Sequence, residues 1–330
     1  MEKSTFKAVV VTETPDNQFK RQITQKFVND LPAGDVLVNV RYSSLNYKDA
    51  LSASGNKGIT KNYPHTPGID AAGIVAECNT GAFTPGDKVI VTSYDLGMNT
   101  SGGFGEFIRV PADWVVKLPD NLSLKESMIY GTAGLTAGLS VYKLTRTLSP
   151  DRGPILVTGA SGGVGSLAVS ILVQSGYEVA GVSDKGEDDE FLKNLGVKEI
   201  ISRQDAADTS GRPMLRERWA GVIDTVGGEI LATAIKSSKL NGNITCCGNA
   251  ASPDLPLTVF PFILRGVTLY GIDSQHCPMD TRLKIWEKLS NEWKLNNLEF
   301  LVSEITLNDL DEKIDRMLAG KAKGRTVIKV

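Results

Sequence analysis

The sequence predicts an α/β protein that combines a doubly wound parallel sheet with a small, barrel-like all-β unit. The chain has 330 residues, more than one ordinary hydrophobic core holds, so we expect two domains. Short strands separated by turns run through the first third, and from about Ser123 strands alternate with helices. The first pattern is typical of a small barrel, and the second of a parallel sheet covered by helices on both faces.

The strands of the first third are bounded by turn residues. Proline and glycine interrupt the apolar runs at Pro32-Ala33-Gly34, Pro67-Gly68 and Pro85-Gly86-Asp87. Between these turns the residues alternate between apolar and polar, as half-buried strands do. The expected strands are 6–11, 35–42, 73–76, 88–91, 107–110 and 114–116.

The rest of the chain repeats a strand–helix unit. Apolar strands are followed by amphipathic stretches of helical length, which favours parallel strands joined by crossover helices. The expected helices are 127–143, 164–175, a segment ending at 195, and one through 231. The expected strands are 155–158, 177–182, 198–201, 221–224, 242–247 and 267–272.

The composition limits the partners of the protein. It is 41% hydrophobic and 22% charged, with 36 basic and 38 acidic residues and a net charge of -2, so it offers no general basic surface for nucleic acid or anionic lipid. No run approaches the roughly 20 apolar residues of a membrane span, and the N-terminus lacks the apolar run of a secretory signal. We expect a small-molecule substrate, no nucleic acid, no membrane and a cytoplasmic location. A reducing compartment also suits the four scattered cysteines, Cys78, Cys246, Cys247 and Cys277.

One segment carries a recognisable binding chemistry. A short apolar strand, 155–158, runs into a glycine turn and then a helix. Glycines there let the backbone approach a pyrophosphate, and the helix N-terminus supplies free N–H groups and partial positive charge. The segment therefore predicts a dinucleotide site, with a simple strand–helix packing turn as the alternative. Its expected contacts are Ala160, which stands at the first glycine position, Ser161, Gly162, Gly163, Val164 and Gly165.

The end of the next strand decides which dinucleotide binds, because residues there meet the adenosine ribose. Asp184 could bind the 2′-hydroxyl of NAD, but it stands one residue late. Ser183, Lys185 and Arg203 could instead surround the 2′-phosphate of NADP. Two cations outweigh one acid, so we expect NADP, although both cations could also be ordinary surface charges.

Four further motifs make the sequence resemble the medium-chain dehydrogenase/reductase superfamily, in its zinc-free quinone-oxidoreductase-like branch, which includes bacterial acryloyl-CoA reductases. They are 46–49 (NYKD), 67–73 (PGIDAAG), 131–137 (GTAGLTA) and 261–266 (PFILRG). The resemblance implies a Rossmann doubly wound parallel sheet inserted into a GroES-like β-barrel domain. It implies a GroES-like catalytic domain at 1–123 and 291–330, and a dinucleotide-binding domain at 124–290. It also implies a homodimer joined through the edge strand near 267–272, which would cover an unpaired apolar edge.

The residues at the zinc positions of related enzymes differ in this chain. Zinc-dependent relatives have a cysteine at Asn46 and a His-Glu pair at Ile69-Asp70, and the cysteines here form no close quartet. The only histidines, His65 and His276, form no ligand cluster. We therefore expect no metal.

The resemblance also implies the remaining site residues. Tyr47 would contact the nicotinamide edge or donate its phenol proton to the substrate, or else pack at a strand end. Asp49 and Asp70 would orient Tyr47 or Lys48, or else cap helices, and Arg265 would attract an anionic substrate tail or form a structural ion pair. The residues expected to line the cofactor cleft are Thr132, Thr136, Asn249, Ile263 and Ser274.

Without a Lewis acid, reduction of an already polarised acceptor suits the chain better than alcohol dehydrogenation. We therefore expect a zinc-independent NADPH-dependent oxidoreductase that transfers hydride to a quinone or to an α,β-unsaturated carbonyl or enoyl thioester such as acryloyl-CoA. The alternative from another class is a non-catalytic NADPH-binding sensor or structural protein.

Overall fold

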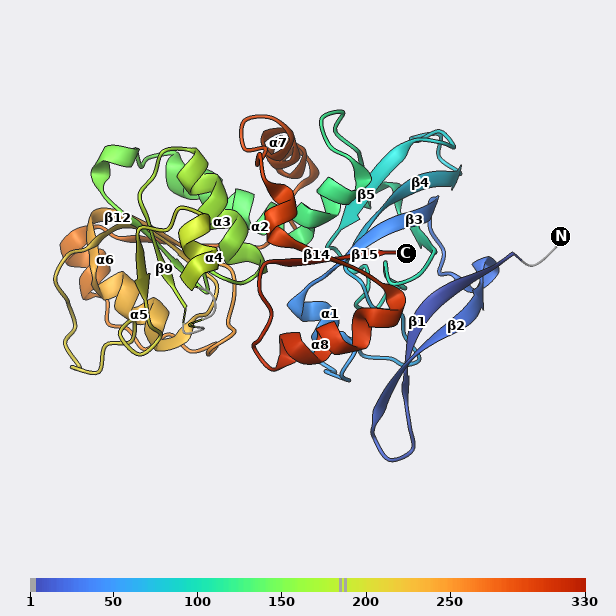
Figure 1. The fold of residues 1–330 in the computed structure, drawn as a ribbon, viewed down its shortest axis with the longest axis horizontal. Helices are drawn as coiled ribbons and strands as arrows, with labels where there is room; N and C mark the ends of the chain where they lie inside the picture. Colours follow the sequence, from blue (N-terminus) through green and yellow to red (C-terminus); the bar gives the residue numbers. More distant parts are fainter. Residues whose placement is uncertain (1–3, 184–185, 187–188) are drawn as a thin grey trace. The chain divides into compact units, whose positions relative to one another are not determined.

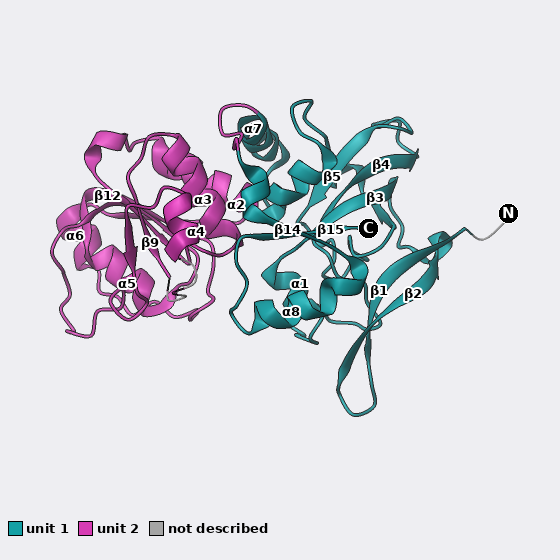
Figure 2. Cartoon of the chain, viewed as in Figure 1, with its two compact units in different colours: residues 1–132, 275–290, 297–330 teal, residues 133–274, 291–296 magenta. Residues whose placement is uncertain are grey.

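The computed structural model describes residues 4–183, 186 and 189–330. The chain divides into two compact units (Figure 2): unit 1 contains Met1–Thr132, Gln275–Ser290 and Asn297–Val330, and unit 2 contains Ala133–Ser274 and Asn291–Asn296. Unit 2 is thus inserted into unit 1, as the resemblance implies. The domain limits expected from the sequence differ from these units, which assign 124–132 and 275–290 to unit 1.

Unit 2 is built on a parallel sheet, of which β9 and β12 are labelled in Figure 1. The sheet has six strands in the order β10-β9-β8-β11-β12-β13. The strands lie within two residues of their expected starts, except at β12, which starts four residues earlier. Their bounds are β8 (Ile155–Thr158), β9 (Val179–Val182), β10 (Glu199–Ile201), β11 (Trp219–Asp224), β12 (Ser238–Cys246) and β13 (Thr268–Gly271). From β8 the chain builds outward first through β9 and β10, and then in the opposite direction through β11, β12 and β13. This reversal makes the sheet doubly wound.

Helices connect these strands. The helices of unit 2 are α3 (Gly163–Gln174), α4 (Asp189–Asn194), α5 (Gly228–Lys236) and α6 (Phe260–Arg265), with a 3-10 turn at Pro150–Arg152. Helix α3 packs against β8 and β9, and α5 against β8, β11 and β12. Because right-handed crossovers in opposite directions place their helices on opposite faces, the sheet is covered on both sides. Buried Ile230, Leu231, Ala234 and Ile235 of α5 form a core with Leu156, Val222 and Ile244 of the strands.

Unit 1 is built on a seven-stranded sheet with the order β14-β15-β3-β4-β5-β7, and β6 also pairs with β3. Its strands are β3 (Val36–Leu45), β4 (Asp70–Cys78), β5 (Lys88–Thr92), β6 (Phe107–Val110), β7 (Val115–Lys117), β14 (Val302–Thr306) and β15 (Arg325–Lys329). Valines of β3, β4 and β5 alternate into a common core, which explains the period-two pattern of the sequence. The C-terminal strand β15 pairs with β3, so segments far apart in the sequence build this sheet.

A two-stranded antiparallel sheet, β1 (Thr5–Glu13) with β2 (Phe19–Phe27), completes the strands of unit 1. Strand β2 was not expected from the sequence, because it is mostly polar and buries little. The helices are α1 (Tyr47–Ser52), α7 (Met279–Ser290) and α8 (Leu310–Leu318), with 3-10 turns at Val28–Asp30, Ala112–Trp114, Leu298–Leu301 and Leu307–Asp309.

Helix α2 (Leu124–Thr145) is interrupted at Gly131, where the backbone leaves the helical region (φ 51, ψ -153). A second helical segment therefore starts at Thr132. A side chain at Gly131 would not fit, because its Cβ would lie 2.5 Å from Asp70 Oδ2 and 2.7 Å from Ser44 Oγ. The glycine thus allows both the break in the helix and a close approach of the backbone to Asp70.

Candidate dinucleotide site and buried polar network

The turn after β8 has the geometry of a dinucleotide loop. Gly159 adopts a left-handed conformation (φ 59), and a Cβ there would lie 2.3 Å from Thr225 Oγ1. A Cβ on Gly165 would lie 2.2 Å from the carbonyl oxygen of Gly159, so Gly165 lets α3 pack closely on the turn. Gly162 is the N-cap of α3, and Ser161 and Val164 flank the helix start. The exposed N–H groups of such a helix start are suited to a pyrophosphate.

The loop lies at the point where the sheet reverses direction. Strand β8 has β9 on one side and β11 on the other, and in such sheets ligands bind at the carboxyl ends of the strands beside this point. The ends of β8 and β11 are joined there, since Thr158 Oγ1 donates to Asp224 Oδ1 at 2.7 Å. Asp224 Oδ2 accepts the N–H of Gly227 at 2.9 Å, and burial raises the pKa of this carboxyl. The residues present fit a dinucleotide.

The structure brings one expected residue of the pyrophosphate loop close to one expected residue of the ribose end. The hydroxyls of Ser161, in the loop, and Ser183, directly after β9, lie 3.3 Å apart. Arg203 is exposed and follows β10, the parallel neighbour of β9. Asp184 and Lys185 lie outside the described residues.

The other expected cofactor residues of unit 2 differ in their contacts and in their exposure to solvent. Thr136 Oγ1 donates to Ser274 Oγ at 2.9 Å, so these two residues form a pair. Asn249 is exposed in the loop after β12, whereas Ala160 and Gly163 belong to the glycine loop itself. The side chain of Ile263, on α6, is 71% exposed.

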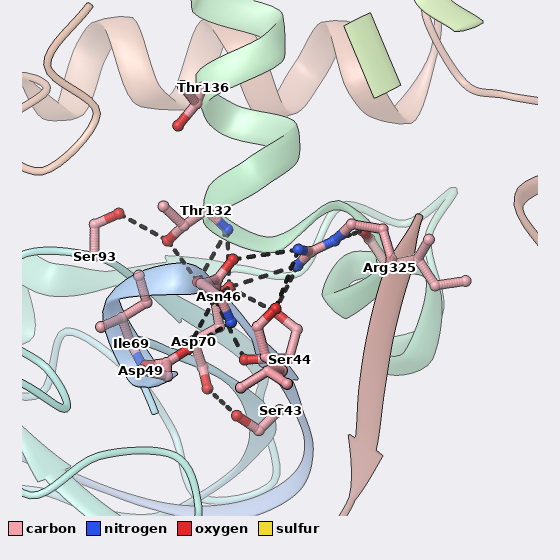
Figure 3. Close-up of polar contacts among 12 residues, drawn as sticks. Ser43, Ser44, Asn46, Asp49, Ile69, Asp70, Ser93, Thr132, Thr136 and Arg325 are labelled. Atoms are coloured by element: carbon pink, nitrogen blue, oxygen red, sulfur yellow. Dashed lines mark hydrogen bonds and ion pairs between the residues drawn. The ribbon is translucent and has the colours of Figure 1, made fainter. Parts of the chain in front are cut away.

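In unit 1, the carboxylate of Asp70 is the centre of a buried hydrogen-bond network (Figure 3). Asp70 is the first residue of β4, and its Oδ2 accepts from Ser44 Oγ at 2.6 Å and from Asn46 Nδ2 at 2.7 Å. The backbone N–H of Thr132 donates to both carboxylate oxygens, and the Thr132 hydroxyl donates to Oδ1 at 2.6 Å. Asp70 therefore caps the second segment of α2, where negative charge is favourable.

A buried arginine completes this network. Arg325, the first residue of β15, donates from Nε to the carbonyl of Ile129 and from Nη2 to Ser44 Oγ, both at 2.8 Å. Its Nη2 also lies 4.0 Å from Asp70 Oδ2. Burial lowers the pKa of Arg325, and the charge of Asp70 opposes that effect. The arginine is thus the countercharge of the network.

Asp49 serves as a helix cap. Its Oδ2 accepts the N–H of Asn46 at 2.8 Å in a capping box at the start of α1, and its Oδ1 accepts the N–H of Ile69 at 2.8 Å. Burial, followed by the nearby charge of Asp70, raises the pKa of Asp49 to about 7. Of the alternatives for the two aspartates, helix capping is the one that their contacts support.

Tyr47 and Lys48 stand at the start of α1. Tyr47 is 47% exposed. Lys48 Nζ donates to Gln275 Oε1 at 2.7 Å.

Arg265 makes contacts that favour the structural alternative. Its Nη1 donates to the carbonyls of Lys236 and Ser238 at 2.8 and 2.9 Å, and its Nη2 donates to the carbonyl of Leu215. Its Nε lies 3.4 Å from a Glu217 carboxylate oxygen. The guanidinium ties α6 to two other segments of unit 2, and we do not carry forward a role toward an anionic substrate.

The residues at the zinc position of related enzymes do not fit a metal ion. The amide of Asn46 is already engaged, with Nδ2 on Asp70 and Oδ1 at 3.3 Å from Arg325 Nη1. A buried guanidinium in this place repels a second cation, and His65 bonds the carbonyl of Gly97 at 2.9 Å. Over 4–183, 186 and 189–330, no three His, Cys, Asp or Glu side chains are grouped to hold a metal.

The sequence interpretation assigned no role to Ser44, Ser93, Gly131 or Arg325. Only the pairing of β15 with β3 brings Arg325 to Asp70. Ser44, in β3, and Ser93, directly after β5, gave no signal of their own.

Comparison with known proteins finds a matching family model for a large part of each unit. Residues 32–120 match the family model described as "Alcohol dehydrogenase GroES-like domain", and residues 163–291 match the model described as "Zinc-binding dehydrogenase". The chain is 41% identical over 327 residues to "Acrylyl-CoA reductase AcuI" of Ruegeria pomeroyi, which covers 98% of this chain and 99% of that protein.

Two further relatives have solved structures with bound dinucleotides. "Putative quinone oxidoreductase YhfP" of Bacillus subtilis is 45% identical over 91% of this chain and 92% of its own, and its structure with NAD bound superimposes with a TM-score of 0.95. The yhdH oxidoreductase from Salmonella enterica in complex with NADP is 41% identical, with a TM-score of 0.95 over 98% of this chain and 99% of that one.

Proposed function

The chain belongs to the medium-chain dehydrogenase/reductase superfamily, and from that premise we propose that it is an NADPH-dependent oxidoreductase that works without zinc. The observation that carries the dinucleotide part of the proposal is the glycine loop at the reversal point of the sheet, where Gly159 and Gly165 leave room only for backbone. The reductase and oxidoreductase relatives reported above support the catalytic part. The bound dinucleotide supplies the hydride.

The chain's own residues have separate tasks in this proposal. The loop from Ala160 to Gly165 holds the pyrophosphate, and Ser183 and Arg203, with Lys185, hold the 2′-phosphate of NADP. Thr132, Thr136, Asn249 and Ser274 line the nicotinamide part of the site, as the resemblance implies. Relatives with NADP and with NAD are both known, so this preference depends on the residues after β9 and β10.

Tyr47 is the residue that we propose acts on the acceptor. Hydride addition to a quinone or enoyl thioester moves negative charge onto an oxygen, which a phenol can stabilise by donating a hydrogen bond. Tyr47 offers such a donor because its side chain is half exposed at the start of α1. Asp49 caps the same helix and so holds the tyrosine's backbone in place.

The acceptor is a quinone or an enoyl thioester such as acryloyl-CoA. The relative named as a putative quinone oxidoreductase supports a quinone, and the relative named as an acrylyl-CoA reductase supports an enoyl thioester. Hydride transfer to an electrophilic acceptor is common to both reactions. The second candidate function is a non-catalytic NADPH-binding sensor or structural protein, which the glycine loop alone would equally support.

We also propose that two copies associate through unit 2. Strand β13 lies at the edge of the six-stranded sheet, and the neighbouring helix α6 exposes several large apolar side chains. The exposed fractions of Val259, Ile263 and Leu264 are 63%, 71% and 61%. Pairing of two such edges would cover both features.

No helix among the described residues is long and apolar enough to cross a membrane. The cytoplasmic location remains part of the proposal and rests on the four scattered cysteines of the sequence, which suit a reducing compartment.

The decisive experiment measures NADPH oxidation by the purified protein against a panel of quinones, enones and acryloyl-CoA, together with zinc content. We expect turnover with at least one class, no stoichiometric zinc, and no loss of activity with a chelator. NADPH binding without reduction of any acceptor would favour the sensor. One tightly bound zinc per chain, lost together with activity, would contradict the metal-free assignment.

A further inference from the structure

Ser93 and Tyr94, directly after β5, form a turn with an unusual backbone. Both residues adopt left-handed conformations, with φ of 63° and 52°, although neither is glycine. Such conformations cost free energy for residues with side chains and persist only where surrounding contacts enforce them. Contacts of the surrounding residues must therefore hold this turn in its conformation.

The Tyr94 ring contacts an aromatic ring and a guanidinium. The ring stacks on Trp114 with centroids 5.4 Å apart and planes 6° apart, and the Arg282 guanidinium carbon lies 4.2 Å from its centroid. Arg282, on α7, is buried and donates from Nη1 to both the carbonyl and the hydroxyl of Thr92 at 2.9 Å. Arg282 and Trp114 thus hold the end of β5 and the following turn in one conformation.

The turn places the buried hydroxyl of Ser93 against Thr132. The two oxygens lie 2.7 Å apart, and the Ser93 N–H is anchored on the carbonyl of Ile69 at 2.8 Å (Figure 3). The single hydroxyl proton of Thr132 points to Asp70 Oδ1 at 2.6 Å. Ser93 must therefore be the donor in the Ser93–Thr132 hydrogen bond. The hydrogen bonds run in one direction, from Ser93 to Thr132 to Asp70.

We propose that Ser93 is a positioning residue for the reaction, which acts by holding the Thr132 side chain and the start of the second segment of α2. This inference rests on the proposed function in so far as Thr132 lines the nicotinamide part of the site. The strained turn brings the serine hydroxyl to Thr132, and the contacts of Tyr94 with Arg282 and Trp114 maintain it.

The test compares Ser93→Ala, Ser93→Gly, Thr132→Val and the double variant Ser93→Ala/Thr132→Val, with NADPH and the best acceptor. We expect Ser93→Ala and Ser93→Gly each to lower kcat about 10-fold or more, with less than about a threefold change in the NADPH Kd. Ser93→Gly should nevertheless unfold at a higher temperature than Ser93→Ala, because glycine tolerates the left-handed turn. The double variant should be no slower than the slower single variant, since Ser93 acts through Thr132.

Ser54→Ala is the matched control, because Ser54 also donates a part-buried hydroxyl bond within unit 1, to the carbonyl of Ala50 at 2.7 Å. It should keep the wild-type kcat. A wild-type kcat in Ser93→Ala, or a double variant whose loss is the product of the two single losses, would overturn the positioning role.

The fluorescence of bound NADPH separates this inference from the proposed function, because it responds to the nicotinamide surroundings without turnover. A shifted emission in Ser93→Ala at unchanged affinity supports the positioning role even if no acceptor is reduced. If no acceptor is reduced, unchanged emission in Ser93→Ala overturns the positioning role. A wild-type protein that binds NADPH and reduces no acceptor contradicts only the proposed function.

Discussion

The carboxylate of Asp70 receives the backbone N–H of Thr132 on both of its oxygens, at 2.9 and 3.0 Å, although the two residues are 62 positions apart. Through this contact the negatively charged carboxylate caps the N-terminus of the second helical segment of α2, directly after the break at Gly131. Arg325 balances that charge from a third part of the chain. The network therefore joins β4, α2 and β15 within unit 1.

Removing both members of the Asp70–Arg325 pair should cost less stability than the sum of the two single removals. Asp70→Asn leaves Arg325 buried without a countercharge, and we expect a loss of about 3–5 kcal/mol in the free energy of unfolding, measured with urea. The double variant Asp70→Asn/Arg325→Met should lose at least about 1 kcal/mol less than the sum of the singles. Glu199→Gln at the exposed Arg218–Glu199 pair is the control, with an expected loss of under about 1 kcal/mol. Additive losses for the Asp70 and Arg325 variants would show that the two side chains are not coupled.

Asp49 should make stability depend on pH. Its pKa is raised from 3.8 to about 7 in the folded state, so its contribution is fully present below about 3.8 and is lost as pH rises through about 7. Between pH 5.5 and 7 the loss amounts to about 2 kcal/mol. Asp49→Asn should remove this slope, which is read from the difference between the variant and wild-type urea curves at each pH.

Asp309→Asn is the matched control for Asp49, because Asp309 also closes a capping box, with Thr306, but is exposed. Hydrogen bonds from Thr306 lower the pKa of Asp309, so its contribution changes only at more acidic pH. An Asp49→Asn variant with the wild-type slope would mean that Asp49 is already ionised throughout this range.

The NADP preference should depend on Ser183 and Arg203. If the proposed site is correct, replacing either with alanine removes a hydrogen bond to the 2′-phosphate. A charge-assisted bond of this kind contributes roughly 1.5–3 kcal/mol, so the NADPH Kd should rise about 10-fold to 150-fold for Arg203→Ala while the NADH Kd barely changes. Lys185→Ala belongs to the same series, and exposed Arg212→Ala is the control. Fluorescence titration measures both constants, and equal weakening of the two cofactors would contradict the assignment.

Tyr47→Phe tests the proposed hydrogen-bond donor to the acceptor oxygen, because it keeps the ring and removes only the hydroxyl. Turnover with an enoyl thioester should fall by about 10²–10⁴ while the NADPH Kd stays the same. Tyr177→Phe, which loses a hydroxyl bond to the carbonyl of Leu148, should keep its activity. Wild-type turnover in Tyr47→Phe, combined with weaker NADPH binding in Tyr47→Ala, would instead assign Tyr47 to packing.

The proposed dimer should depend on the apolar surface of α6. Ile263→Glu or Leu264→Glu would bury a charge at the contact, so we expect the sedimentation coefficient to fall from that of a dimer to that of a monomer. Leu318→Glu, on α8 of unit 1, should leave the assembly unchanged. A wild-type protein that sediments as a monomer would contradict the proposal directly.

The sequence alone determined much of unit 2 and its binding loop. Local rules suffice there: strand 155–158, the glycine turn and helix α3 are consecutive, and the alternation of apolar strands with helices is repeated along the chain. The short strands of the first third were predicted for the same reason. Strand β2 was not, because its polar residues bury little and carry no periodic signal.

Only the tertiary structure decided the roles of the buried polar residues. The sequence left Asp49 and Asp70 open between capping and orienting Tyr47, and left Arg265 open between a substrate contact and an ion pair. Hydrogen bonds between distant segments settle what these side chains touch: Asp70 meets Thr132, and Arg265 meets the carbonyls of Lys236 and Ser238. Ser93 and Arg325 gave no signal in the sequence, because a polar side chain acquires its partner only when the strands that carry it are paired and packed. Periodicity along the chain reports burial, whereas the identity of a long-range partner depends on the three-dimensional pairing of strands and helices.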